Sequence, residues 1–291
     1  MFAADPRHPD DTAHAQPPPQ EERPKFLREV PIQRYRLTVA YDGSDFFGWQ
    51  KQHPPNAEPL RTGQGVLEAT LTRVLRQPIN LVGASRTDSG VHALGQTAHY
   101  DAASPIPLEK LAHAINSKLP PDMEVRDARV APPDFDAISS AIRKRYRYRL
   151  HRLPTRPLGT RKLVWHYHEP LNPDLMNAAA ARLIGTHDIE GLSAAGHGRD
   201  STVRTIFDCH VENHPNELHV VIEGDGFLYN TVRIVVGTLI EAGRARFGPE
   251  RIDEILQTAD RRLAGPTAPA SGLWLEKIWY PGDEEQHPQD P

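Results

Sequence analysis

The amino-acid sequence predicts an α+β fold, with sheets covered by helices. Segments with strand periodicity and segments with helix periodicity are mixed along the chain, and several neighbouring strands resemble hairpins. The two commonest phosphate-binding loops, GxGxxG and GxxxxGK(S/T), are absent, which argues against a doubly wound nucleotide-binding fold. The length of 291 residues suffices for one large domain or two of ordinary size.

The clearest strand of the first half spans residues 34–41. Tyr35, Leu37 and Val39 lie on one face, with arginine and threonine residues opposite, as expected for a strand with one buried side. The other elements expected in this half are a helix at 65–76, a short strand at 79–83, a helix at 108–119 and a strand at 124–130.

Residues 143–150 form a second strand, in which tyrosine and leucine alternate with arginine. An aromatic face opposite an arginine face is compatible with a strand that lies beside nucleic acid. The remaining elements expected in this half are helices at 173–184, 226–243 and 251–259, and strands at 204–211, 218–222 and 273–280.

The two ends of the chain differ in composition from the rest. Residues 1–31 are rich in proline and polar side chains, so they are expected to be disordered. Residues 282–291 contain four acidic residues and no Lys or Arg, and they are expected to form a disordered acidic tail. Without this tail, the net charge of -4 becomes neutral.

Basic residues are concentrated between positions 143 and 162, without an intervening carboxylate. A local basic stripe matters more for phosphate binding than the global charge does, although a solvated charged face is the alternative interpretation. The stripe consists of Arg143, Lys144, Arg145, Arg147, Arg149, Arg152, Arg156, Arg161 and Lys162.

Composition also narrows the compartment. No apolar run approaches the roughly 18 residues of a membrane span, and the first 30 residues lack the apolar core of a secretory signal. Cys209 is the single cysteine and alternates with apolar residues, so we expect a buried thiol in a reducing compartment. The sequence therefore predicts a cytoplasmic protein.

Asp88 is the first candidate for a chemical role. It lies in a polar turn after a short apolar strand, and Gly90 permits a positive φ or a close backbone approach there. Arg86 is placed to pair with the carboxylate and keep it ionised. Local features alone favour a turn-capping aspartate. His92 and His99 are expected to be polar or buried, hydrogen-bonded histidines, because they lack partners at zinc spacing.

Five segments in order resemble the tRNA pseudouridine synthase A family, over residues 33 to 281. Each segment alone is a weak signal, but five in the correct order make the resemblance specific. The segments are Tyr41-Asp42-Gly43 with Gly48-Trp49-Gln50; Arg86-Thr87-Asp88-Ser89-Gly90-Val91-His92-Ala93 with Gly95-Gln96; Asp134-Phe135-Asp136-Ala137 with Arg145-Tyr146-Arg147-Tyr148; Gly226-Phe227-Leu228-Tyr229-Asn230-Thr231-Val232-Arg233 with Val236-Gly237; and Ala268-Pro269-Ala270-Ser271-Gly272-Leu273.

The resemblance implies a site that combines residues distant in the chain. Asp88 would be the nucleophile, Tyr146 would pack on the target uracil, and Arg233 would pair with Asp88. Arg86 would contribute to substrate binding beside the nucleophile. The target uridine would have to be flipped out of an RNA helix. The arginines of the stripe would hold the RNA backbone without reading sequence, namely Arg143, Arg145 and Arg147.

The same resemblance implies the pseudouridine synthase fold, with two similar α/β halves. Their mixed, mainly antiparallel sheets would join around a basic RNA-binding cleft, with residues 32–142 carrying the catalytic aspartate and residues 143–281 forming the second half. It further implies a homodimer that acts on tRNA at positions 38 to 40 of the anticodon arm. The reaction is an isomerisation, so no cofactor or metal is expected.

Three other functions stay open at this stage. One is an RNA-binding or RNA-chaperone protein on the same scaffold, and another is a uridine isomerase that acts on a different RNA. The third is a metal-dependent hydrolase using Asp88 and histidines, which is disfavoured because no ligand cluster is visible in the sequence.

The sequence departs from the family pattern near the expected site. Ser85 stands where the family usually has glycine, and Asp136 and Ile138 replace a histidine and an arginine. Further departures are Thr231, the segment 189–192 and an insertion at 54–61. These differences leave the Asp88, Tyr146 and Arg233 set intact but affect the expected rim of the pocket.

Overall fold

A computed structural model describes residues 24–52, 54, 58–196 and 200–283, and its described residues form two compact units. The N-terminal unit comprises residues 24–142 together with 277–283, and the C-terminal unit comprises Arg143–Glu276. The last strand, β10 (Leu273–Trp279), crosses from one unit to the other. The sequence-based division placed 277–281 in the second half, whereas the structure groups these residues with the first.

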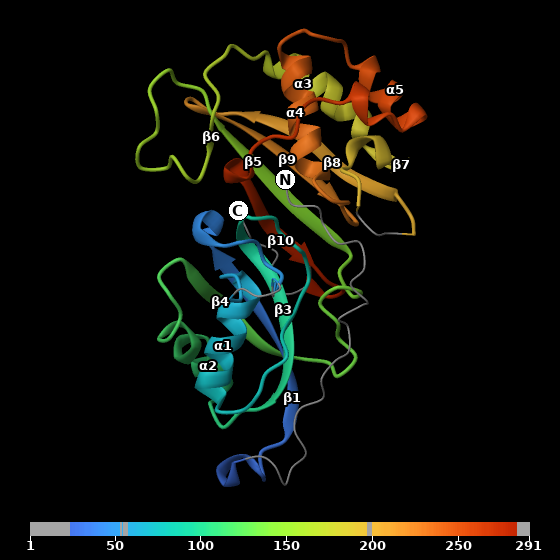
Figure 1. Cartoon of the computed structure of the whole chain (residues 1–291). Helices are drawn as coiled ribbons and strands as arrows, with labels where there is room; N and C mark the ends of the chain where they lie inside the picture. Colours follow the sequence, from blue (N-terminus) through green and yellow to red (C-terminus); the bar gives the residue numbers. More distant parts are fainter. Residues whose placement is uncertain (1–23, 53, 55–57, 197–199, 284–291) are drawn as a thin grey trace. The chain divides into compact units, whose positions relative to one another are not determined.

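The N-terminal unit is built on three antiparallel strands with two helices beside them (Figure 1). Strand β1 (Ile32–Tyr41) lies between β3 (His92–Ala103) and β4 (Met123–Ala131), and the short β2 (Val82–Gly83) pairs with β3. Along β1, Tyr35, Leu37, Val39 and Tyr41 are buried, so the expected alternation is confirmed.

Helices α1 (Gly63–Leu75) and α2 (Leu108–Asn116) supply the apolar side of this core. Leu67 and Leu71 of α1 and Leu111 and Ile115 of α2 are fully buried. Thr62 caps the N-terminus of α1, because its hydroxyl accepts a hydrogen bond from the Gly65 N–H and so satisfies a donor of the first turn.

The C-terminal unit contains an antiparallel sheet in the order β5-β9-β8-β7 (Figure 1). Its strands are β5 (Arg143–His151), β9 (Glu217–Gly224), β8 (Val203–Asn213) and β7 (Gly185–Asp188), with β6 (Trp165–His166) parallel to β5. The helices are α3 (Pro173–Ala180), α4 (Thr231–Gly243) and α5 (Glu250–Thr258). Mixed elements and mainly antiparallel pairing confirm the predicted α+β class.

The two faces of strand β5 have different partners on strand β9. Tyr146, Tyr148 and Leu150 are buried, and each is aligned in register with a buried aliphatic residue of β9. The arginines between them lie on the opposite, partly exposed face. Helix α4 is buried along almost its whole length, as its apolar composition predicts.

Short parts of the two terminal segments belong to the described residues. Residues 1–23 and 284–291 lie outside the described residues. Within 24–31, a short 3₁₀ helix at Lys25–Leu27 buries Leu27 completely. Asp283, expected in a disordered tail, forms an ion pair with Arg36 at 2.7 Å.

Composition led to two further expectations, one about Cys209 and one about membrane-spanning segments. Cys209 on β8 is buried, as expected, and burial raises the pKa of its thiol. Among the helices of the described residues, none combines the length and the apolar character needed to span a membrane.

Candidate active site

The Asp88 loop connects β2 with β3 in the N-terminal unit and is fixed by several backbone contacts. The Trp49 N–H donates to the Thr87 carbonyl at 3.0 Å, and the Val91 N–H donates to the Asp88 carbonyl at 3.1 Å. The Tyr41 and Thr87 hydroxyl groups are 2.7 Å apart in a buried hydrogen bond. These contacts hold the peptide groups on both sides of Asp88.

Two glycines permit this loop geometry. Gly48 has a φ of +86°, and a Cβ at this position would lie 2.6 Å from the Thr87 carbonyl oxygen. Gly90 has a φ of +81°, in the region that favours glycine. The missing side chain at Gly48 lets the Gly48-Trp49 segment pass close to the backbone of Thr87 and Asp88.

His92, the first residue of β3, contacts the turn that follows β1. His92 is completely buried, and its Nδ1 accepts a hydrogen bond from the Gly43 N–H at 3.0 Å. The Asp42 Oδ1 lies 3.2 Å from the same nitrogen. His92 therefore connects the Tyr41-Asp42-Gly43 turn to the start of β3, which agrees with the prediction of a buried, hydrogen-bonded histidine.

His99 has a comparable role farther along β3. Its ring is buried, and its Nδ1 accepts from the Ala137 N–H at 3.0 Å. Asp136 itself caps the following turn, because its Oδ1 accepts from the N–H groups of Ile138 and Ser139, each at 2.8 Å. Burial raises the pKa of the Asp136 carboxyl, but these backbone bonds, the nearby His99 and the Ser139 hydroxyl together outweigh it and lower the pKa overall.

The Ser85 departure has a simple local account. Its φ is not positive, so this backbone does not require glycine. The side chain of Gln96, which is fully buried, holds both peptide groups of Ser85: its Oε1 accepts from the Ser85 N–H at 3.2 Å, and its Nε2 donates to the Ser85 carbonyl at 2.6 Å. Asp88 is partly exposed and Arg86 is exposed. The ion pair between these two residues stays a prediction.

Tyr146 and Arg233 both lie near the segment that joins β9 to α4 in the C-terminal unit. The Tyr146 ring is buried and packs edge-to-face on Phe227, with the ring centroids 5.3 Å apart. Phe227 lies in the loop that leads from β9 into α4, and Arg233 is in the first turn of that helix. The helix begins at Thr231, so the expected start at Gly226 was too early.

The Arg233 guanidinium is held in place by two short contacts. Its Nε donates to the Ala268 carbonyl at 2.7 Å, and its Nη1 donates to Asn230 Oδ1 at 2.8 Å. Asn230 has a φ of +61° at the helix entrance. A cation in the first turn of a helix opposes the helix dipole, so helix stability alone does not account for an arginine here.

Tyr148 connects β5 to residues 268–272, which belong to the last of the five family-like segments. Its hydroxyl donates to the Pro269 carbonyl at 2.7 Å, and a Cβ on Gly272 would lie 2.5 Å from its ring. Burial raises the Tyr148 pKa, while the nearby positive charge of Arg233 opposes that rise. Residues 268–272 thus contact both Arg233 and Tyr148.

The arginine face of β5 is balanced by carboxylates from other strands. Arg145 pairs with Glu223 at 2.5 Å, and Arg143 lies 3.5 Å from the same carboxylate. Arg147 pairs with Glu212 and Glu276. These pairs were not predicted, because the carboxylates come from β8, β9 and β10. The role of these arginines as RNA anchors stays a prediction.

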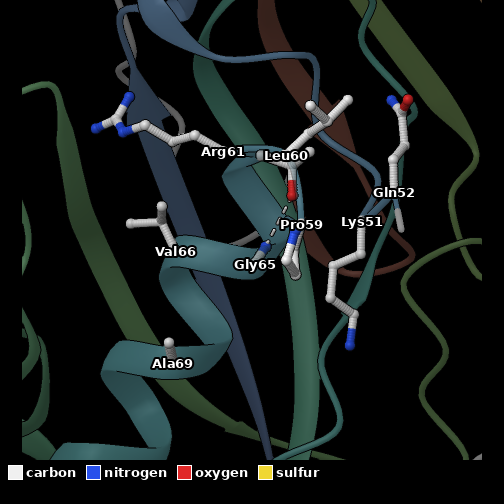
Figure 2. Close-up of a pocket in the computed structure, with 9 residues that line it drawn as sticks. Lys51, Gln52, Pro59, Leu60, Arg61, Gly65, Val66 and Ala69 are labelled. Atoms are coloured by element: carbon white, nitrogen blue, oxygen red, sulfur yellow. Dashed lines mark hydrogen bonds between the residues drawn. The ribbon is translucent and has the colours of Figure 1, made fainter. Parts of the chain in front are cut away.

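A pocket lies beside the start of α1, where the inserted loop meets the helix (Figure 2). Leu60 and Val66 line it, together with the cations Lys51 and Arg61. Each cation has a carboxylate partner: Lys51 pairs with Glu68 at 2.6 Å, and Arg61 pairs with Asp122 at 2.8 Å. The pocket lining includes none of the predicted site residues, so it is separate from the candidate active site.

One group of potential metal ligands has no counterpart in the sequence-based expectations. Strands β8 and β9 bring Glu212, His214 and His219 together, with one ligand atom of each within 4.8 Å of the others. The signal, two histidines and a glutamate around a hairpin turn, is visible only once the strand register is known.

The family model and the individual relatives found by comparison with known proteins indicate the same family. The model of the tRNA pseudouridine synthase family matches residues 37–138 and 179–281. The tRNA pseudouridine synthase A of Thermoanaerobacter sp. (strain X514) is 44% identical over 248 residues, which cover 84% of this chain and 98% of the relative. The protein of the same name from Latilactobacillus sakei subsp. sakei (strain 23K) is 43% identical over 251 residues, covering 85% of this chain and 99% of the relative. The matched ranges include Asp88 and Arg233, whereas Tyr146 lies between them.

Proposed function

Because the chain belongs to the tRNA pseudouridine synthase family, we propose that it isomerises uridine to pseudouridine in tRNA with Asp88 as the nucleophile. Its enzyme class is that of an isomerase. The proposed targets are positions 38 to 40 of the anticodon arm, and the proposed working form is a cytoplasmic homodimer.

The reaction exchanges one bond at the ribose C1′ for another. The N1–C1′ bond breaks, the base rotates, and a C5–C1′ bond forms; a proton leaves C5, and N1 ends with a hydrogen. A carboxylate suits this sequence because it is nucleophilic and can leave again. Attack by Asp88 on the ribose and attack on the base both satisfy this balance. No redox step or nucleotide hydrolysis is required.

The observation that carries the proposal is the anchored loop around Asp88. Its neighbours Thr87 and Val91 are held by backbone hydrogen bonds, while the Asp88 side chain itself is partly exposed. A nucleophile on a fixed backbone keeps its reacting geometry at little entropic cost when the substrate binds.

Tyr146 and Arg233 supply the two other groups that the reaction uses. An unstacked uracil can pack on an aromatic ring, and such stacking contributes about 1–3 kcal/mol per base. Arg233 keeps a carboxylate ionised when the two meet, and its two fixed hydrogen bonds limit the rotamers that it can adopt. The convergence of Asp88 with these two residues is part of the proposal, as is substrate binding by Arg86.

Mapping pseudouridine on unmodified tRNA transcripts tests this function. The wild-type chain is expected to modify uridines at positions 38 to 40, and Asp88→Ala and Asp88→Asn are expected to abolish modification while retaining the circular dichroism spectrum. Ser89→Ala is the matched control, because Ser89 is the exposed neighbour of Asp88.

The outcomes separate the alternatives. No modification of any transcript by the wild-type chain, together with retained tRNA binding, would favour an RNA-binding or chaperone protein. Modification outside the anticodon arm would keep the isomerase and change the target. Full activity of Asp88→Ala would refute the nucleophile.

A further inference from the structure

A group of three metal-ligating side chains lies at the β8–β9 hairpin, separate from the residues assigned to catalysis. Glu212 and His219 are aligned directly opposite each other in the strand register, and His214 follows Glu212 by two positions. The register therefore places Glu212 and His219 on the same side of the hairpin, and His214, in the turn after β8, brings a ring nitrogen within 4.8 Å of their ligand atoms.

The ligand atoms of this group converge on one carboxylate oxygen. The His214 Nε2 lies 3.0 Å from Glu212 Oε2, and the His219 Nδ1 lies 3.8 Å from the same oxygen. The His214 Nε2 carries a hydrogen in this contact, and that hydrogen has to move to Nδ1 when Nε2 binds an ion. The centroids of the two imidazole rings are 4.2 Å apart. Four-coordinate Zn²⁺ binds nitrogen and oxygen at about 2.0–2.2 Å, so small rotations of these side chains suffice to surround an ion.

The tautomer of His219 is fixed in the form that a metal ion needs. Its Nε2 lies 2.7 Å from Glu217 Oε2, and a carboxylate only accepts, so Nε2 carries the hydrogen. The Nδ1 lies 3.2 Å from Arg147 Nη1, which only donates, so Nδ1 presents its lone pair. A carboxylate behind the far nitrogen of a ligating histidine is the usual outer partner at metal sites.

We propose that Glu212, His214 and His219 bind a divalent transition-metal ion of the Zn²⁺ class, with water in the fourth position. The imidazole and carboxylate donor set suits such an ion better than Mg²⁺ or Ca²⁺, which prefer oxygen ligands. This inference concerns the C-terminal unit alone and does not depend on the proposed catalytic reaction.

Arg147 is the competitor for the same position. Its Nη1 donates to Glu212 and approaches His219 Nδ1, while its Nε donates to Glu276 Oε1. A bound ion is coordinated by Glu212 and His219 in place of the guanidinium, which remains paired with Glu276. The arginine therefore acts as an internal cation that the metal ion displaces, so removing its charge is expected to tighten metal binding.

Isothermal titration of the untagged, chelator-treated full chain with Zn²⁺ tests this site. One ion per chain is expected to bind the wild-type protein, and binding is expected to weaken about tenfold or more in His214→Ala and Glu212→Gln. Arg147→Met is expected to bind more tightly than wild type. His113→Ala is the matched control, because His113 is exposed on α2 in the other unit.

Thermal unfolding gives a second measurement, because an ion that binds only the folded hairpin raises Tm. Zn²⁺ is expected to raise Tm of the wild-type and His113→Ala proteins and, at the same Zn²⁺ concentration, to raise Tm of His214→Ala less. Circular dichroism of the metal-free variants shows whether each one is folded. Equal Zn²⁺ affinity of folded His214→Ala and wild type would overturn the site, and binding by folded Arg147→Met that is no tighter than wild type would overturn the displacement of the arginine.

Discussion

The hydroxyl group of Tyr41 lies 2.7 Å from the hydroxyl group of Thr87, one residue before Asp88. Both side chains are buried, and Tyr41 ends β1 while Thr87 belongs to the Asp88 loop. Tyr41 belongs to the first of the five family-like segments and Thr87 to the second. This bond therefore lets the first segment position the second.

Replacing Tyr41 by phenylalanine tests the positioning role of this bond. The variant leaves the Thr87 hydroxyl without its buried partner, so we expect a loss of about 1–3 kcal/mol in the free energy of unfolding. We also expect a fall in kcat of pseudouridine formation with little change in KM. Tyr35→Phe is the control, because the Tyr35 hydroxyl bonds Gln33 instead. Equal losses of kcat in both variants would contradict a specific role for Tyr41.

Gly48→Ala tests the close approach to the Thr87 backbone. A φ of +86° and a Cβ contact of 2.6 Å with the Thr87 carbonyl oxygen make alanine strained at this position. We expect destabilisation of about 1–3 kcal/mol, measured by urea unfolding, together with reduced activity. Gly159→Ala is the matched control, because a Cβ at Gly159 would meet nothing within 4 Å and its φ is not positive. A stable and fully active Gly48→Ala protein would show that the loop has room to move.

Asp283 makes the stability of the N-terminal unit depend on pH. Burial raises the pKa of its carboxyl, but the Arg36 guanidinium outweighs burial, so the folded-state pKa is lowered. The stabilisation is therefore present above the unfolded-state pKa and is lost as pH falls through the lowered value. We expect Asp283→Asn to reduce the free energy of unfolding by about 1–3 kcal/mol at neutral pH, with the difference from wild type vanishing in acid. A difference that persists unchanged in acid would exclude this ion pair as its source.

The pair of Arg145 with Glu223 predicts a stability effect that is separate from RNA binding. Glu223 is buried and Arg145 is partly exposed, so loss of the arginine removes a close partner of a buried carboxylate, and Arg143 at 3.5 Å compensates in part. We expect Arg145→Met to destabilise the protein by about 1–3 kcal/mol and Glu223→Gln to destabilise it less. A double-mutant cycle in urea measures the coupling. Additive effects of the two substitutions would show that the pair contributes no coupling energy.

The sequence predicted those parts of the fold in which one face of an element is buried. The alternation on β1 and β5 was readable because buried residues and partly exposed residues take turns along each strand. Strand β3 was missed because almost all of its residues are buried, including small residues and polar residues with internal partners. Its sequence therefore has neither alternation nor an apolar run.

The candidate site shows the same limit. The resemblance selected Asp88, Tyr146 and Arg233 because their motifs stand in order along the chain. The carboxylates opposite the β5 arginines were not predictable, since Glu212, Glu223 and Glu276 come from three other strands. Local sequence specifies the charge of a side chain, but strand register decides which charge lies opposite it.

The passage of β10 from one unit to the other has a consequence for synthesis on the ribosome. The C-terminal unit is one continuous stretch, Arg143–Glu276, whereas the N-terminal unit also needs residues from Lys277 onward. Among these, Tyr280 donates its hydroxyl hydrogen to the Ala137 carbonyl, and Asp283 pairs with Arg36. The unit translated first is consequently completed last, so a nascent chain released before Lys277 would contain every residue of the C-terminal unit and an N-terminal unit without its closing segment.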